Sequence, residues 1–192
     1  MLLWIILLVV AAAIVYAIVV FNSLVRTRQM ANEGWSGIDV QLKRRSDLVP
    51  NLVDSVKGYA AHERSVLEQV TQLRSRARAL PEGDVAARAQ AEGALSAALG
   101  KLVALAENYP DLKASGNFLE LQQQLSDLES EIQMARRYYN GAVRNLNVLV
   151  QSFPSNLIAG LSGFTQRDYF EISDAADRAV PEVALQPPPP AR

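Results

Sequence analysis

The sequence contains no cysteine and a single histidine, His62. The lack of cysteine excludes disulfide bonds, thiol nucleophiles and cysteine metal ligands. One histidine cannot build a zinc site without further good ligands, so we predict no metal and no other cofactor. The net charge is only −1, which excludes a global positive field that would attract nucleic acid.

Recognisable catalytic motifs are also missing. There is no GxxxxGK[ST] loop, no GxGxxG opening a βα unit and no nucleophile-elbow sequence. The short basic run LKRR at residues 42–45 is flanked by Asp39 and Asp47, which favours a lipid-facing flank over a nucleic-acid site. We therefore predict no catalytic residue and no small-molecule substrate. The protein is expected not to be an enzyme, and a hydrolase built inside a helical bundle is the minor alternative.

One long apolar run is present. Residues 1–21, MLLWIILLVVAAAIVYAIVVF, carry no charge, and about 20 apolar residues suffice to cross a bilayer as a helix. A cleaved signal peptide would show a basic start and a shorter apolar run, so we predict a retained single-pass anchor, with cleavage near residues 11–13 as the alternative. Arg26 and Arg28 follow the run and no basic residue precedes it. The positive-inside rule then places Met1 outside and the C-terminal domain in the cytoplasm.

Two apolar seams follow the anchor in alternating steps of three and four residues, which predicts helices that pack against helices. The second seam is wholly apolar: Phe118, Leu121, Leu125, Leu128, Ile132, Ala135, Tyr139, Ala142, Leu146, Leu149 and Phe153. The first seam, from residue 35 to residue 80, is interrupted by Arg45 and Glu63. We expect Arg45 to be exposed, because a kink at Pro50 would turn that row outward; for Glu63 a register-fixing role and exposure both stay open.

Breakers between these seams set the expected helix ends. LPEGD at residues 80–84 ends one helix and supplies Asp84 as the N-cap of the next, and Asn117 with Glu120 resembles a capping box for the last long helix. The fold class is therefore all-α: a single N-terminal transmembrane helix followed by an antiparallel bundle of three to four long helical segments. Either residues 22–80 bend back at Pro50 to form a compact bundle, which we favour, or the exposed seam pairs with other copies.

The C-terminal part divides into an apolar segment and a tail. We assign residues 22–170 to the bundle, with residues 152–170 as a cap over its end. The alternative is a docking surface for a partner or a membrane. Its candidate interaction residues are Leu157, Ile158, Leu161, Phe164, Tyr169 and Phe170. Residues 171–192 contain five prolines and are predicted to be a flexible tail.

Several blocks of the sequence resemble the LemA family. They are FNSLVRTRQMANEGWSGIDVQLKRRSDLVPNLVDSVKGYAAHE, ENYPDLKASGNFLELQQQL, ARRYYNGAVRNLN and FPSNLIAGLSGFTQRDYF. The resemblance covers residues 21–170 in order, with one departure at Gly37, where an acidic residue is expected. It implies a bacterial membrane-anchored helical bundle with a small extracellular N-terminal end, and it carries over no catalytic residue.

These observations favour a non-enzymatic single-pass protein of the bacterial inner membrane. Its helical domain is expected to assemble with itself or to scaffold envelope proteins, with membrane lipid and another membrane protein as partners. The alternative is an adaptor that presents clients to a membrane protease or export system through residues 157–170.

Overall fold

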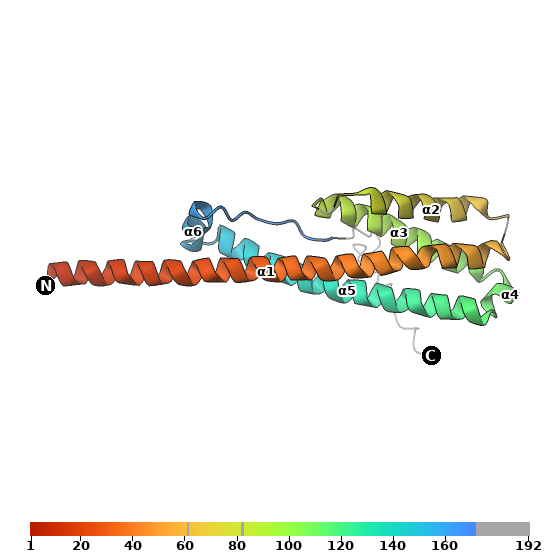
Figure 1. Cartoon of the computed structure of the whole chain (residues 1–192), viewed down its shortest axis with the longest axis horizontal. Helices are drawn as coiled ribbons and strands as arrows, with labels where there is room; N and C mark the ends of the chain where they lie inside the picture. Colours follow the sequence, from red (N-terminus) through yellow and green to blue (C-terminus); the bar gives the residue numbers. More distant parts are fainter. Residues whose placement is uncertain (61, 82, 172–192) are drawn as a thin grey trace, which may run out of the picture.

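The structure is a computed structural model that describes residues 1–60, 62–81 and 83–171. Within these residues the chain is all-α, which confirms the predicted fold class, and no strand is found there. The elements are α1 (Leu2–Lys57), α2 (Arg64–Ala79), α3 (Val85–Ala106), α4 (Pro110–Lys113), α5 (Gly116–Gln151) and α6 (Ser155–Leu161). Figure 1 shows a long rod in which α1 and α5 lie side by side, with α2 and α3 along one side of that pair.

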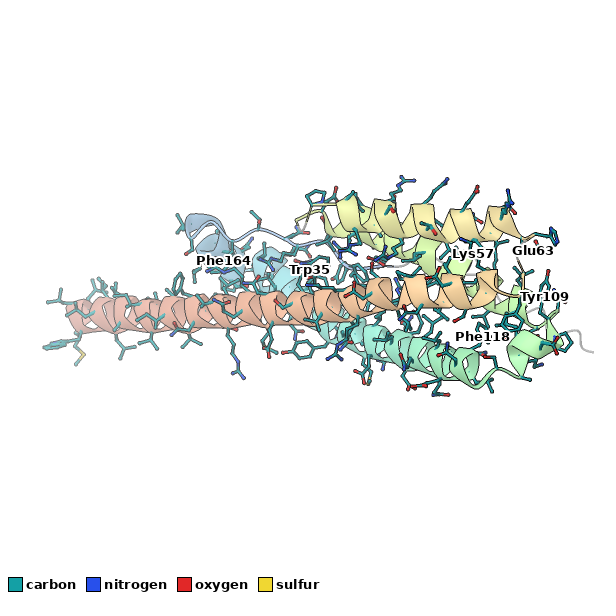
Figure 2. All side chains as sticks on the ribbon, turned by 45° about the vertical axis from the view of Figure 1, so that its right-hand side comes forward. Trp35, Lys57, Glu63, Tyr109, Phe118 and Phe164 are labelled. Carbon is teal, nitrogen blue, oxygen red and sulfur yellow. The ribbon has the colours of Figure 1, made fainter. Side chains whose placement is uncertain are left out.

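Helix α1 runs without a break for 56 residues, straight through Pro50. The chain reverses instead between the end of α1 at Lys57 and the start of α2 at Arg64, so the bend predicted at Pro50 is wrong, although the favoured compact bundle is found. Proline removes one backbone donor and tends to kink a helix. Here the Ser46 carbonyl, which Pro50 leaves without a donor, accepts a hydrogen bond from the Arg74 side chain of α2. Glu63 therefore lies in the turn before α2, at the far end of the rod from Met1 (Figure 2).

Helices α2 and α3 form an antiparallel pair joined by the predicted LPEGD turn. Asp84 caps α3, since its Oδ1 accepts a hydrogen bond from the Ala87 backbone N at 2.9 Å, as predicted. The capping box at Asn117 is wrong: α5 already begins at Gly116, and its N-cap residue Ser115 makes no side-chain cap bond. The tight turn after α4 fixes the chain before Asn117 is reached.

Three clusters of buried side chains follow one another along the rod. The cluster farthest from the N-terminus joins α1, α2, α3 and α5, the middle one centres on Ile38 and Tyr139, and the third holds Val20, Leu24 and Leu146. Most positions of the second predicted seam are buried in these clusters, but Phe153 is 80% exposed. The seam therefore packs within one chain over most of its length.

The N-terminal part of α1 extends beyond the rest of the bundle (Figure 1). It is apolar and long enough to cross a membrane, and other parts of the chain bury only 6% of its most apolar window. Val20 is the first residue of α1 that is buried, and Leu24 is the first with no exposed surface. The candidate membrane span therefore passes directly into the packed domain within one helix.

Candidate functional site

The end of the bundle nearest the apolar run is built by the last described segment of the chain. After α5 ends at Gln151, α6 forms one short helix, a turn follows at Ser162 and Gly163, and residues 164–171 then run without regular secondary structure back along α5 (Figure 1). We call residues 162–171 the C-terminal strap. Backbone outside regular secondary structure needs partners for its N–H and C=O groups when it is buried, and α5 supplies them.

Two asparagines of α5 bind the backbone of the strap. Asn147 accepts from the Arg167 N–H at 2.9 Å and donates to the Arg167 carbonyl at 2.9 Å. Asn140 does the same at Phe170, at 2.9 and 3.2 Å. Seven helical residues span about 10 Å, and three extended residues span about the same distance. The heptad spacing of the two amides thus matches every third residue of the strap, which runs antiparallel to α5.

Phe170 closes this contact with an aromatic cluster. Its ring is fully buried and lies 5.8 Å from the Trp35 ring, which in turn lies 5.7 Å from Tyr139. The Tyr139 hydroxyl donates to the Asp168 carbonyl at 2.9 Å. Burial raises the pKa of Tyr139 above its usual 10.0, and nearby Asp168 raises it further while Arg167 opposes the shift. The phenol thus stays protonated as a donor.

Phe164 anchors the start of the strap against α1. The Phe164 and Phe21 rings meet edge-on, with 6.0 Å between their centroids. The guanidinium of Arg28, which is also on α1, lies 4.7 Å from the centre of the Phe164 ring. The same buried cluster contains Ala159 of α6 and Leu24 of α1. Helix α6 is therefore held at the level where the apolar run of α1 ends.

The structure divides the six candidate interaction residues into two groups. Phe164 and Phe170 are buried and Ile158 is half-buried against the chain's own helices. Leu157 is 58% exposed, Leu161 91% and Tyr169 38%. A partner that binds this segment from outside thus meets the exposed face of α6 and Tyr169, while the two phenylalanines serve internal packing.

A second polar feature lies inside the bundle around Arg45. The prediction that Arg45 is exposed is wrong: it has no exposed surface. Its guanidinium forms ion pairs with Glu92 of α3 at 2.6 Å and Glu129 of α5 at 2.5 Å, and it also donates to Ser96. Because α1 stays straight at Pro50, the seam position of Arg45 remains inside the bundle, where α3 and α5 supply the carboxylates.

The ion pairs continue outward from Glu92 to the surface. Arg88 contacts Glu92 at 3.2 Å and Asp39 of α1 at 3.1 Å. Two arginines and three carboxylates from α1, α3 and α5 thus form one chain of ion pairs that fixes the register of these helices. Sequence analysis missed Glu92 and Glu129, although a charged residue in an apolar seam signals that opposite charges face it from other helices.

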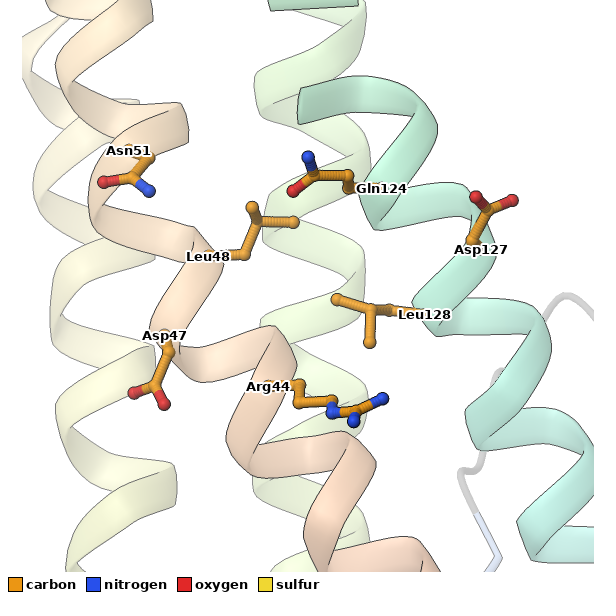
Figure 3. A pocket seen from close by; sticks show the side chains of 7 residues that line it. All are labelled: Arg44, Asp47, Leu48, Asn51, Gln124, Asp127 and Leu128. Carbon is orange, nitrogen blue, oxygen red and sulfur yellow. The ribbon is translucent and has the colours of Figure 1, made fainter. Parts of the chain in front are cut away.

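A shallow groove lies on the surface between α1 and α5. Figure 3 shows its lining, in which Leu48 and Leu128 lie between polar side chains of both helices. The other lining residues are Arg44, Asp47, Asn51, Gln124 and Asp127. A small-molecule site normally encloses its ligand in an apolar cavity with convergent polar groups, and this groove is open and carries mixed charge.

Metal-binding chemistry has no visible site in the described residues. Among them, no group of three His, Cys, Asp or Glu side chains is positioned to hold a metal ion. His62 lies exposed in the turn between α1 and α2. The described residues thus offer exposed surfaces for contact, and their internal ion pairs hold the helices together.

The fold and site define a helical-bundle domain whose first helix begins as a candidate membrane span. The model described as the LemA family matches residues 34–185. The chain belongs to the LemA family, as its sequence blocks predicted. The match begins thirteen residues after the predicted resemblance and continues past the described residues.

Curated relatives carry two kinds of name. "Magnetosome protein MamQ 2" from Paramagnetospirillum magneticum is 26% identical, with 89% of this chain and 72% of the relative covered. "Magnetosome protein MamQ" from Magnetospirillum gryphiswaldense is 25% identical over 83% of this chain and 68% of the relative. "Protein LemA" from Metamycoplasma hominis is 30% identical over 72% of this chain and 63% of the relative. The similarity spans most of the helical domain.

Proposed function

We propose that this protein is a non-enzymatic, single-pass membrane protein whose rigid helical domain assembles with further copies and scaffolds other envelope proteins. The observation that carries the proposal is the continuity of α1, which joins the candidate span to the bundle over 56 helical residues. A scaffold gains from such a helix because the domain keeps one height relative to the bilayer.

The distribution of polar groups supports a structural role over catalysis. Arg45, the most deeply buried charge, is held by two carboxylates from two other helices. A catalytic group needs access to substrate and a pKa suited to proton transfer. Arg45 has no exposed surface, so its charge acts on the packing of the helices.

Large apolar side chains on the outside of the α1–α5 pair support self-assembly. Val40 on α1 and Met134 and Tyr138 on α5 are each close to half exposed. Anchoring in a membrane raises the local concentration of copies, so a modest apolar face suffices for association. The proposed partners are therefore a second copy, another membrane protein and membrane lipid.

Single cysteines test self-assembly without background, because the natural chain has none. The full chain is expressed in bacterial membranes with Val40→Cys or Met134→Cys, and with Ser75→Cys on the exposed side of α2 as the matched control. We expect oxidative crosslinked dimers at the α1 and α5 positions and not at Ser75. Absence of crosslinks at every exposed α1 and α5 position, together with a monomer in mild detergent, would contradict self-assembly.

The proposed location is the bacterial inner membrane, with Met1 outside and the bundle in the cytoplasm. Arg26 and Arg28 directly follow the apolar run, which supports this orientation. A membrane-impermeant maleimide should label Ser75→Cys in inverted membrane vesicles and leave it unlabelled in intact spheroplasts. Labelling in intact spheroplasts would reverse the orientation.

A further inference from the structure

The face of the bundle nearest the apolar run exposes large apolar side chains that the chain itself leaves uncovered. Phe153 is 80% exposed, Leu157 58% and Leu161 91%. All three lie on α6 or directly before it. Single exposed apolar residues are normal on a protein surface, but these three lie within nine residues, in and just before one short helix, and we treat them as one patch.

The position of this patch is fixed relative to the candidate span. Ala159 of α6 and Phe164 of the strap share a buried cluster with Val20 and Leu24 of α1, and the apolar run of α1 ends at Phe21. Figure 1 shows α6 as the part of the bundle closest to the N-terminus, alongside α1. When residues 2–21 cross a bilayer, α6 therefore lies at the boundary between acyl chains and headgroups.

Charge is distributed unevenly along the rod, with a positive end next to α6. Residues 1–32 and 141–167, which form the end with α6, contain four arginines and no Asp or Glu. Residues 33–131, which include the far end, contain eleven basic and fifteen acidic residues, a net charge of −4. Anionic lipid headgroups attract arginine and repel carboxylate. The end of the rod that faces the bilayer is thus the one whose charge suits it.

We propose that α6 is a second membrane contact, in which Phe153, Leu157 and Leu161 enter the interface of an anionic bilayer beside α1. Arg26, Arg28 and Arg167 then lie at headgroup level. The C-terminal strap holds α6 in this position, because Asn147 and Phe164 fasten it to α5 and α1. Two contacts, α1 and α6, would set the tilt of the rod on the membrane, which a single helix leaves free.

The occupant of the patch is lipid, and a protein partner is an outcome of the test. The patch continues the apolar surface of the candidate span, and the surrounding charge matches anionic headgroups. The proposal rests on the anchor in the proposed function, so the experiment includes a probe in the anchor itself.

The test places a polarity-sensitive fluorophore on single cysteines of the full chain in phosphatidylethanolamine–phosphatidylglycerol vesicles. Leu161→Cys reports on α6 and Ala12→Cys on the anchor. Leu119→Cys is the control, because Leu119 is also an exposed leucine, at 49%, and lies about 45 Å away along α5, at about 1.5 Å per residue. Each probe is challenged with aqueous iodide and with two brominated lipids, one carrying bromine near the headgroup to reach Leu161→Cys and one carrying it deep in the acyl chain to reach Ala12→Cys.

We expect a blue-shifted emission and quenching by brominated lipid at Leu161→Cys and Ala12→Cys, and quenching by iodide alone at Leu119→Cys. Replacing phosphatidylglycerol by phosphatidylcholine should lower lipid quenching at Leu161→Cys and leave Ala12→Cys unchanged. If Ala12→Cys is lipid-quenched while Leu161→Cys responds to iodide only, the α6 contact is wrong and the anchor stands. Protection of Leu161→Cys from both quenchers shows a protein cover and overturns the lipid proposal. Lack of lipid quenching at Ala12→Cys overturns the anchor itself.

Discussion

Arg74 Nε donates a hydrogen bond to the backbone carbonyl of Ser46 at 2.6 Å. In an α-helix that carbonyl would accept from the N–H of the residue four positions on, which is Pro50 and has none. A side chain of α2 thus replaces the hydrogen bond that proline removes from α1. This contact explains how α1 passes Pro50 without a break, and it ties α2 to the point where α1 would otherwise be weakest.

A double-mutant cycle tests this relationship. Arg74→Met should lower the free energy of unfolding by about 1–3 kcal/mol, because the buried Ser46 carbonyl loses its donor. In a Pro50→Ala background the helix supplies its own donor, so the same substitution should cost clearly less. Arg76→Met, at an exposed position of α2, is the control and should change little. Thermal unfolding followed by circular dichroism measures all four variants. Equal costs of Arg74→Met in both backgrounds would refute the compensation.

Arg45 provides the second prediction. Arg45→Met should destabilise the bundle by about 3–5 kcal/mol, because it removes the fully buried one of the two arginines that pair with the buried Glu92. The neighbouring Arg44→Met removes an exposed charge and should change stability by less than about 0.5 kcal/mol. Unfolding by urea compares the two. A similar small effect for both would mean that the ion pairs contribute nothing to stability.

Two glycines of α1 form a matched pair. A Cβ at Gly34 would lie 2.9 Å from the backbone Cα of Tyr139, whereas a Cβ at Gly37 meets nothing within 4 Å. Gly34→Ala should therefore force α1 and α5 apart and cost about 1–3 kcal/mol. Gly37→Ala should stabilise by up to about 1 kcal/mol through helix propensity. Thermal midpoints that shift in the same direction for both substitutions would contradict the close approach at Gly34.

The strap gives a prediction on local opening. Asn147→Leu and Asn140→Leu each remove two hydrogen bonds to strap backbone, at Arg167 and Phe170. The unpaired groups should lower the free energy of strap opening by about 1–3 kcal/mol. Trypsin should therefore cut faster after Arg167. Asn145→Leu, at an exposed position of α5, is the control. Unchanged cleavage in both strap variants would show that aromatic packing alone holds the segment.

Tyr139 predicts an alkaline limit to stability. Its pKa is raised in the folded protein by burial, so the unfolded chain ionises first as pH rises through about 10. The stabilisation that comes from keeping the Tyr139 phenol protonated is therefore fully present below pH 10. It is lost as the pH rises through the higher pKa of Tyr139 in the folded protein. Tyr139→Phe should flatten the fall of stability above pH 10 while lowering stability at neutral pH through the lost bond to Asp168. An identical alkaline fall in the natural and variant proteins would exclude Tyr139 as its cause.

Elements whose cause is local could be predicted from the amino-acid sequence. An uncharged run of 21 residues predicts the candidate span, and steps of three and four residues predict helices without reference to any partner. Asp84 was also predictable, because an N-cap acts on backbone only three residues away. Leu157 and Leu161 were predicted as interaction residues only because they are large and apolar. Phe164 and Phe170 share that property, so the exposed and the buried residues could not be told apart from the sequence.

Features that depend on partners far away in the chain could be seen only in the folded protein. Pro50 alone predicts a break, and its missing donor is replaced by Arg74 from another helix. Arg45 reads as an exposed interruption until Glu92 and Glu129 are brought to it by α3 and α5. Asn140 and Asn147 look like surface residues of a helix until the strap returns along α5. In each case the hydrogen-bond or ion-pair partner of a polar group comes from a distant part of the chain. The periodicity of apolar residues shows which face of a helix is buried, but not which residues pack against that face.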